Sequence, residues 1–253
     1  MDNRPLSRFW ELDFIRGLAV VMMVLYHLLY DLNYFGVRSL NVRSGFWLYF
    51  AEATATIFIV LVGASLTLSA SRLEMQGSSG KIFMVFFKRG LKIFSLGAVI
   101  SLTTYLSIGR GFILFGVLHL IGVSIILAYP FLRLRAFNLL AGLIFVLIGI
   151  YLQEHTFDFA WLIWLGFVPE NFYSLDYFPI FPWFGLILIG IYLGKSLYKH
   201  GRRSFKLPDL SDSFFVNLLG VLGRNSLLVY LVHQPVLVAI LLFTGMMSFK
   251  YPI

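Results

Sequence analysis

Residues 14–32 read FIRGLAVVMMVLYHLLYDL, and this apolar run decides the fold class. A helix of about 20 predominantly apolar residues crosses a hydrocarbon core of about 30 Å. The run contains Arg16, follows Glu11 and Asp13, and lacks a small-residue cleavage site. These features predict a membrane-spanning helix and not a cleavable signal peptide.

Comparable runs continue to the end of the chain. The predicted spans are 13–34, 46–71, 88–108, 112–132, 136–152, 182–198 and 224–244. The stretch 157–168 is shorter and carries Trp161 and Trp164, which is typical of an interfacial or re-entrant element, with an eighth crossing as the alternative. We therefore expect an all-α, polytopic transmembrane helix bundle of about seven spans, with residues 1–253 forming a single integral-membrane domain.

The composition supports a bilayer environment. Of the 253 residues, 59% are hydrophobic and 13% are charged, whereas soluble domains carry about 25% charged residues. Cysteine is absent, which excludes disulfides, thiol nucleophiles and thiolate metal sites, and no metal site is expected. The net charge of +8 comes from basic residues in short loops, so it indicates membrane topology and not nucleic-acid binding.

The basic residues also predict the orientation. Seven spans with the N-terminus inside place 16 Lys and Arg residues on the cytoplasmic side and four outside, namely Arg38, Arg43, Arg110 and Lys250. The outer segment 154–178 is acidic. Because cytoplasmic loops are enriched in Lys and Arg, we expect a multi-pass cell-membrane protein with its N-terminus in the cytoplasm and its C-terminus outside.

Three histidines, His27, His119 and His233, fall inside predicted spans. Each lies about 13–16 Å along its helix from a basic residue near one end, given a rise of 1.5 Å per residue. The three imidazoles would thus share a level in the middle to outer half of the membrane, and a common cavity would explain this. Ionisable groups there are costly and suggest function, although a hydrogen-bonded packing histidine is the alternative for each.

One face of the first span carries Asp13, Arg16, His27 and Asp31. Eleven residues at about 100° each bring His27 back over Arg16 after three turns. Asp31, one turn after His27, is expected to orient its ring as in an orienter–base pair, and Asp13 to hold Arg16. This pattern predicts a catalytic site with His27 as the general base.

Binding residues are predicted on other spans. Lys88, Arg89 and Lys92 form a candidate clamp for nucleotide phosphates, and Arg224 joins this cofactor-binding set, with positive-inside topology as the alternative. The segment DYFPIFPW, residues 176–183, offers Asp176, Tyr177 and Trp183 for a sugar ring, or a plain aromatic belt. Glu52, near the outer end of the second span, is either a substrate contact or interfacial.

Four segments carry a family resemblance. Residues 11–27, ELDFIRGLAVVMMVLYH, resemble the opening helix of the transmembrane acyltransferase superfamily, and the spacing of Arg16 and His27 is similar to the acyltransferase family 3 motif. The segments FGVLHLIG (115–122), DYFPIFPW (176–183) and GRNSLLVYLVHQP (223–235) look closer to the heparan-α-glucosaminide N-acetyltransferase catalytic-domain family in its small prokaryotic form.

This resemblance implies transfer of an acyl group, acetyl above all, from cytoplasmic acyl-CoA to a carbohydrate or glycolipid acceptor reached from the other side. Acetyl-CoA or another acyl-CoA would be the co-substrate, and Arg16 and His27 would matter for the reaction. His27 would be the general base on the acceptor hydroxyl or amine, which would attack the thioester carbonyl directly. His233 or His119 would instead carry the acyl group or assist proton transfer. Arg16 would contact CoA phosphates or brace the site.

Two other functional classes stay open. Intramembrane His and Asp residues also build proton relays, so a proton-coupled transporter or permease is the first alternative. A non-catalytic assembly or anchoring protein is the second, and it predicts no CoA binding and full tolerance of His27→Ala. The sequence leaves homo-oligomerisation open.

Overall fold

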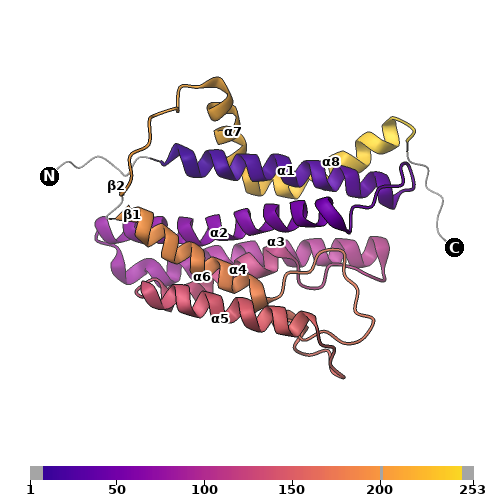
Figure 1. Cartoon of the computed structure of the whole chain (residues 1–253), viewed down its shortest axis with the longest axis horizontal. Coiled ribbons are helices and arrows are strands. Elements are labelled where there is room, and N and C mark those ends of the chain that lie inside the picture. Colours follow the sequence, from indigo (N-terminus) through magenta and orange to yellow (C-terminus); the bar gives the residue numbers. More distant parts are fainter. Residues whose placement is uncertain (1–7, 200–201, 247–253) are drawn as a thin grey trace. The chain divides into compact units, whose positions relative to one another are not determined.

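The structure, a computed structural model, describes residues 8–199 and 202–246 and is almost entirely helical within them. The helices are α1 (Trp10–Tyr34), α2 (Gly45–Met75), α3 (Ile82–Ile108), α4 (Val117–Phe131), α5 (Ala136–Gln153), α6 (Ile180–Leu197), α7 (Phe214–Arg224) and α8 (Ser226–Phe243). Short 3-10 turns occur at η1 (Ser79–Lys81) and η2 (Ile163–Leu165), and β1 (Tyr198–Lys199) pairs with β2 (Arg202–Arg203). The predicted all-α membrane bundle is confirmed (Figure 1).

Six helices of the described chain are long and apolar enough to cross a membrane: α1, α2, α3 with η1, α5, α6 and α8. They correspond to six of the seven predicted spans. The fourth predicted span differs, because α4 has only 15 residues and covers about 22 Å. Residues 112–116, which the sequence placed in this span, are not helical.

The non-helical start of the fourth span pairs with the loop before α6. Leu175 N donates to Gly111 O and Phe178 N donates to Phe115 O, both at 2.9 Å, and Phe115 bridges Tyr177 in parallel. Backbone outside a helix is tolerated at membrane depth only where such partners exist. An extended segment followed by α4 therefore takes the place of one continuous helix.

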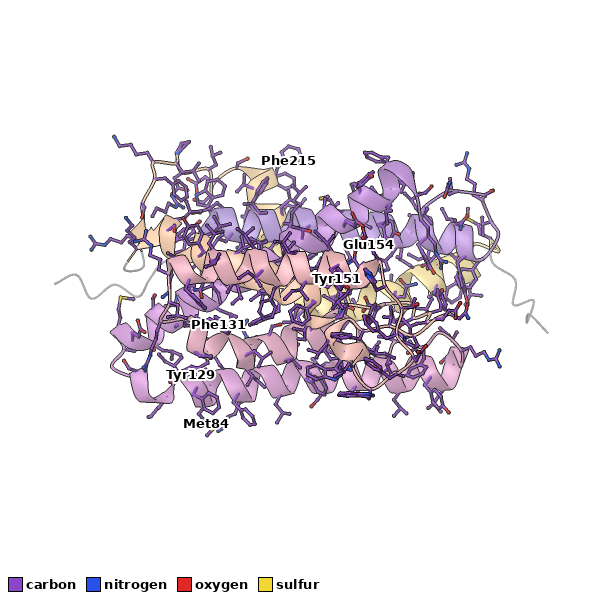
Figure 2. All side chains as sticks on the ribbon, turned by 60° about the horizontal axis from the view of Figure 1, so that its bottom comes forward. Met84, Tyr129, Phe131, Tyr151, Glu154 and Phe215 are labelled. Atoms are coloured by element: carbon purple, nitrogen blue, oxygen red, sulfur yellow. The ribbon has the colours of Figure 1, made fainter. Side chains whose placement is uncertain are left out.

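Helix α4 runs antiparallel to α3. A Cβ on Gly90 would lie 2.6 Å from Gly122 O, and the rings of Phe83 and Tyr129 are 5.2 Å apart. Figure 2 shows Tyr129, near the end of α4, on the same side as Met84, near the start of α3. The end of α4 thus returns to the level at which α3 begins, as a fourth crossing requires.

Helix boundaries also differ from the prediction at α3 and before α8, whereas residues 157–168 form no spanning helix, as expected. Helix α3 begins at Ile82, six residues before the predicted start at 88. The last predicted span, 224–244, begins instead after a break at Asn225, and the sequence missed α7 before it. The stretch 157–168 holds only η2 and is closed by a hydrogen bond from Phe157 N to Val168 O, so no eighth helix crosses there. The predicted positions of Arg4, Lys250 and the C-terminus lie outside the described residues.

The chain divides into two compact units. Unit 1 comprises residues 1–58 and 207–253, in which α1 packs against α7 and α8. Glycine permits the close approach of α1 and α7, because a Cβ on Gly17 would collide with Leu219 O and one on Gly223 with Asp13 O.

Unit 2 comprises residues 59–206. Within it α3 packs on α4, α4 on α6, and α5 on α6, which lie side by side (Figure 1). A Cβ on Gly185 would lie 2.5 Å from Gly142 O, so small residues again set the helix spacing. The core of this unit is apolar and includes Phe86, Leu120, Phe184, Ile187 and Ile191.

Candidate functional site

Two histidines of unit 1 meet across α1 and α8. The rings of His27 and His233 lie 4.7 Å apart and edge to face. His27 Nδ1 is 2.9 Å from Met23 O, and His233 Nδ1 is 2.7 Å from Tyr230 O. Because a carbonyl oxygen only accepts, each Nδ1 carries the proton and each neutral ring keeps its lone pair on Nε2. Both rings are therefore set as proton acceptors at Nε2.

The expected hydrogen bond between Asp31 and His27 is not formed. A helical side chain leans toward the N-terminus of its helix, which brings His27 Nδ1 to the carbonyl of Met23, one turn earlier. Asp31, only 2% exposed, accepts instead from Gln234 Nε2 on α8 at 2.8 Å. The carboxylate thus links the two helices that carry the histidines, and it does not orient His27 directly.

Three buried polar atoms beside this pair have no hydrogen-bond partner within residues 8–199 and 202–246: Asp31 Oδ2, Gln234 Oε1 and His233 Nε2. All three accept hydrogen bonds when the histidine is neutral and the carboxylate ionised. Buried polar groups are nearly always paired, so an unpaired set indicates a place for a proton, a water molecule or a donor group of a ligand. We call His27, Asp31, His233 and Gln234 the His27–His233 cluster.

Gln234 is a member of this cluster that the sequence reasoning missed. Its signal was an amide directly after a histidine inside an otherwise apolar helix, in the run SLLVYLVHQPVLVAILLF of α8. A buried amide needs hydrogen-bond partners, so a glutamine in an apolar helix indicates a polar partner on a neighbouring helix, as the histidine before it does.

Arg16 is held by Asp13 as expected, with Nη1 3.0 Å from Oδ1. The pair lies where α7 crosses α1 at Gly17 and Gly223. Since Arg16 precedes His27 by 11 residues, about 16 Å along α1 separates it from the His27–His233 cluster. Arg224 is exposed at the end of α7, and Glu52 is exposed on α2.

His119 lies in unit 2 and has a different setting. Its Nδ1 accepts from Gly116 N at 3.3 Å, so the proton sits on Nε2, the opposite tautomer from His27. The ring is 5% exposed and packs between Phe94 and Phe115. The first amides of a helix lack intrahelical partners, and His119 serves one of them. That His119 shares a cavity with the other two histidines stays a prediction.

Asp176 serves the same helix end. Its Oδ2 accepts from Val117 N at 3.1 Å, at the first residue of α4. A carboxylate at a helix N-terminus both pairs with the amide and complements the helix dipole. Asp176 thus fixes the start of α4 to the loop that precedes α6, while His119 bonds to the same helix end from within α4.

The remaining aromatic candidates brace that loop. The Tyr177 hydroxyl donates to Ile163 O at 2.8 Å, and burial raises the pKa of its phenol, so it remains a donor at any physiological pH. Trp183 packs on Phe178 with ring centroids 4.7 Å apart, just after the start of α6. A cis peptide joins Phe181 to Pro182.

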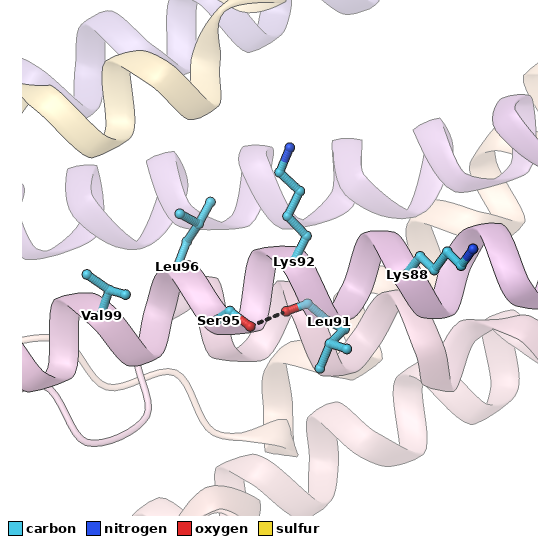
Figure 3. A pocket seen from close by; sticks show the side chains of 6 residues that line it. All are labelled: Lys88, Leu91, Lys92, Ser95, Leu96 and Val99. Carbon is cyan, nitrogen blue, oxygen red and sulfur yellow. Dashed lines mark hydrogen bonds between the residues drawn. The ribbon is translucent and has the colours of Figure 1, made fainter.

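Two of the three predicted phosphate-binding residues line a groove on α3 (Figure 3). It has a volume of about 450 Å³ and is lined by Lys88, Leu91, Lys92, Ser95, Leu96 and Val99. Lys88 and Lys92 are four residues apart on one face, and Arg89 is not part of the lining. Since α3 begins at Ile82, Lys92 lies about 15 Å along the helix and not at its inner end. The groove is basic toward the start of α3 and apolar beyond Ser95.

Metal ligands are not grouped in the described ranges, where no three His, Cys, Asp or Glu side chains come together as an ion site.

Comparison with known families gives one match. A family model described as heparan-alpha-glucosaminide N-acetyltransferase, catalytic, matches residues 8–235. Comparison with curated proteins and with solved structures finds no match. The matched range runs from before Arg16 to the end of the GRNSLLVYLVHQP segment and includes every candidate residue named above. The chain therefore belongs to the heparan-α-glucosaminide N-acetyltransferase catalytic family, a family of membrane acetyltransferases.

Proposed function

We propose that this chain moves an acyl group, acetyl in the first instance, from cytoplasmic acyl-CoA to a carbohydrate or glycolipid acceptor on the outer side of the cell membrane. The family match covers parts of both units, which supports treating residues 1–253 as one catalytic domain. The observation that carries the proposal is the His27–His233 cluster, in which each imidazole has its Nδ1–H engaged by a backbone carbonyl.

The cluster can supply base catalysis. His27 is only half-buried, whereas His233 Nε2 is buried, so His27 is the one that meets a substrate. Its Nε2 would take the proton of the acceptor hydroxyl or amine as that atom attacks the thioester carbonyl. The new C–O or C–N bond forms, the C–S bond breaks, and the imidazolium returns the proton to the CoA thiolate. Well-placed base catalysis contributes about 10²–10⁴-fold to the rate.

His233 has a supporting or alternative role in this scheme. Its ring lies edge-on to His27 and would share the proton, or it would itself carry the acyl group in a two-step reaction. The chain has no cysteine, so an acyl-thioenzyme is impossible. Asp31, through Gln234, would hold α1 and α8 in register and stabilise the charged form of the pair.

The donor is assigned to the α3 groove. Lys88 and Lys92 present two ammonium groups one turn apart, which suits the phosphates of CoA. From Lys88 to Val99 the groove follows α3 for about 16 Å, and its lining changes from basic to apolar along that length. A nucleotide at the basic end would leave its pantetheine arm along Ser95 and Leu96. Arg16 and Arg224 remain candidates for additional phosphate contacts.

Release of free CoA tests the proposal. Purified protein is given a panel of acyl-CoAs with and without a sugar mixture, and thiol release is followed for the wild type and for His27→Ala. We expect acceptor-dependent release by the wild type and loss of that release in His27→Ala, with folding and acyl-CoA binding retained. His155→Ala is a matched control, because His155 makes the same type of Nδ1 contact, 2.7 Å to Tyr151 O, but is exposed beyond α5.

The alternatives give different results in this assay. Equal release by wild type and His27→Ala would remove His27 from catalysis. A transporter would consume no thioester in either protein, and His27→Ala would stop uptake and proton flux instead. An anchoring protein would neither bind CoA nor respond to the substitution.

A further inference from the structure

A second depression in unit 2 contains none of the candidate residues. It has a volume of about 730 Å³, within the range typical of small-molecule sites. Its walls are the last turns of α3, the turn that follows, and a short part of the loop before α6. The side chains that line it include Tyr105, Arg110, Phe112, Asn171 and Tyr173.

The two walls of this depression are bonded to each other. Leu175 N donates to Gly111 O at 2.9 Å, and Ser174 Oγ donates to Phe112 O at 3.0 Å. Gly111 has φ +83°, and a Cβ there would lie 2.6 Å from the Tyr173 ring. The tyrosine thus rests on a glycine that leaves room for it, and the two hydrogen bonds hold the walls of the depression together.

The lining combines aromatic faces with one cation and one amide. Tyr105 and Tyr173 are 57% and 49% exposed, and Phe112 meets Tyr105 edge to face at 5.2 Å. Arg110 is the only charged residue of the lining. Its planar guanidinium can donate two hydrogen bonds to one phosphate, which the ammonium group of a lysine does less well. Asn171 adds an amide from a backbone at φ +63°, a conformation uncommon outside glycine. Flat rings, an amide and one arginine match a sugar that carries a phosphate.

One wall continues into the apolar surface of α3. Leu102 precedes Tyr105 by three residues and Ala98 precedes it by seven, so the three share one face of the helix. Leu102 is 59% exposed on a helix long and apolar enough to span the membrane. A ligand in the depression would therefore have lipid directly beside it, which favours a ligand with a hydrocarbon tail.

We propose that this depression binds the headgroup of a phosphate-linked glycolipid, with the sugar between Tyr105 and Tyr173, the phosphate on Arg110 and the tail along Leu102 and Ala98. We take this glycolipid to be the acceptor of the acyl group, and that part of the inference rests on the proposed function. The acceptor is then a saccharide carried by a lipid and not a free sugar.

Direct binding tests the site without turnover. The full chain is placed in phosphatidylcholine nanodiscs, and binding of a polyprenyl phosphate that carries one glucose is measured by native mass spectrometry. We expect binding by the wild type and at least about tenfold weaker binding by Arg110→Gln, which loses a charge-assisted contact, and by Tyr173→Ala, which loses an aromatic face for the sugar. Arg38→Gln, an exposed arginine also predicted outside, is the matched control and should bind as the wild type does.

Competitors separate the possible sources of the phosphate. Glucose 1-phosphate or phosphatidylglycerol at equal concentration should displace little of the probe. Displacement by the free sugar phosphate would overturn the lipid component, and displacement by phosphatidylglycerol would overturn the sugar component. Unchanged affinity in both Arg110→Gln and Tyr173→Ala would overturn the site itself.

Failure of the site and failure of the acyltransferase proposal look different. Probe binding that depends on Arg110, together with no CoA release from any acyl-CoA, would leave the site standing and remove the acyl transfer. CoA release that requires a free sugar and is unaffected by Arg110→Gln would keep the acyl transfer and overturn the glycolipid acceptor.

Discussion

His27 and Asp31 are one turn apart on α1, yet they form hydrogen bonds in different directions. His27 donates backward to Met23 O, whereas Asp31 accepts from Gln234 on α8. The spacing of two residues on a helix shows that they share a face, but it does not decide which of several neighbours each will bond. In this site His27 bonds to Met23 O because helical side chains lean toward the N-terminus of their helix.

The first residue-scale prediction concerns Asp31→Asn. An asparagine keeps an oxygen for Gln234 Nε2 but brings no charge to the His27–His233 cluster. We expect CoA release to fall about tenfold, because the bond from Gln234 is kept but loses its charge assistance, and so less than in His27→Ala. Glu154→Gln, which neutralises an exposed carboxylate just after α5, should have no effect. A loss in Asp31→Asn as large as in His27→Ala would show that Asp31 takes part in the proton transfer itself.

The residues of the site were predictable to different degrees. The ion pair of Arg16 with Asp13 follows from a spacing of three on a helix, and the structure forms it. The bond from Gln234 to Asp31 joins residues 203 positions apart, and no local pattern encodes that. His119 was grouped with the other histidines by depth alone, but its ring accepts from the Gly116 amide, three residues earlier at the start of its own helix.

At the scale of elements, α4 shows how a short helix is completed by its surroundings. Its first amide bonds to Asp176, and the segment before it pairs with residues 175–178. The sequence placed the start of this span at 112 because residues 112–116 are apolar. Their extended conformation depends on partners from a distant loop, which hydropathy does not report.

The prediction for this element is that Asp176→Ala lowers the free energy of unfolding by about 1 kcal/mol, the usual effect of losing a helix cap. Thermal unfolding in detergent measures it, and hydrogen exchange should accelerate at the Val117 amide. Asp158→Ala removes an exposed carboxylate from the same loop and is the control. Unchanged stability together with weaker acceptor binding would return Asp176 to the role of a substrate contact.

Helix α3 carries the donor prediction. Replacing Lys88 and Lys92 together by Gln should weaken acyl-CoA binding and make the remaining binding less dependent on salt, because two groove-lining charges are lost. Arg89→Gln removes a neighbouring charge that is not part of the lining and should have a smaller effect. Isothermal titration at two salt concentrations measures both. Equal affinity in the double variant and the wild type would leave the lysines a topological role only.

The short helix α7 and the break between it and α8 could not be predicted from the hydropathy of the sequence either. Residues 214–224 read FFVNLLGVLGR, too short for a span, and the sequence treated them as part of a loop. They form α7 because Gly17 and Gly223 let its backbone approach α1 closely, a tertiary effect. Long, strongly apolar helices were predictable from composition, while short helices that depend on packing were not.

For the whole molecule, the number of crossings depends on α4. Seven crossings put 16 basic residues inside and four outside. If α4 did not cross, the eight basic residues from Arg133 to Arg224 would move outside and Lys250 inside, which leaves nine inside and 11 outside. The chain would then lose the charge asymmetry that orients membrane proteins. The antiparallel course of α3 and α4 supports the crossing as well.

Cysteine accessibility checks the crossing, and the natural chain has no cysteine to mask the signal. Exposed loop positions Ser39, Ser79, Leu134 and Asp158 are each replaced by Cys and probed with an impermeant thiol reagent in intact cells. We expect Ser39→Cys and Asp158→Cys to label at once, and Ser79→Cys and Leu134→Cys only after permeabilisation. The last two positions flank α3 and α4, so they share a side only if both helices cross. Labelling of Leu134→Cys from outside, with Asp158→Cys protected, would mean that α4 turns back within the membrane and that the acidic loop before α6 faces the cytoplasm. The outer acceptor site would then be on the wrong side for the reaction, and the proposed direction of acyl transfer would be refuted with it.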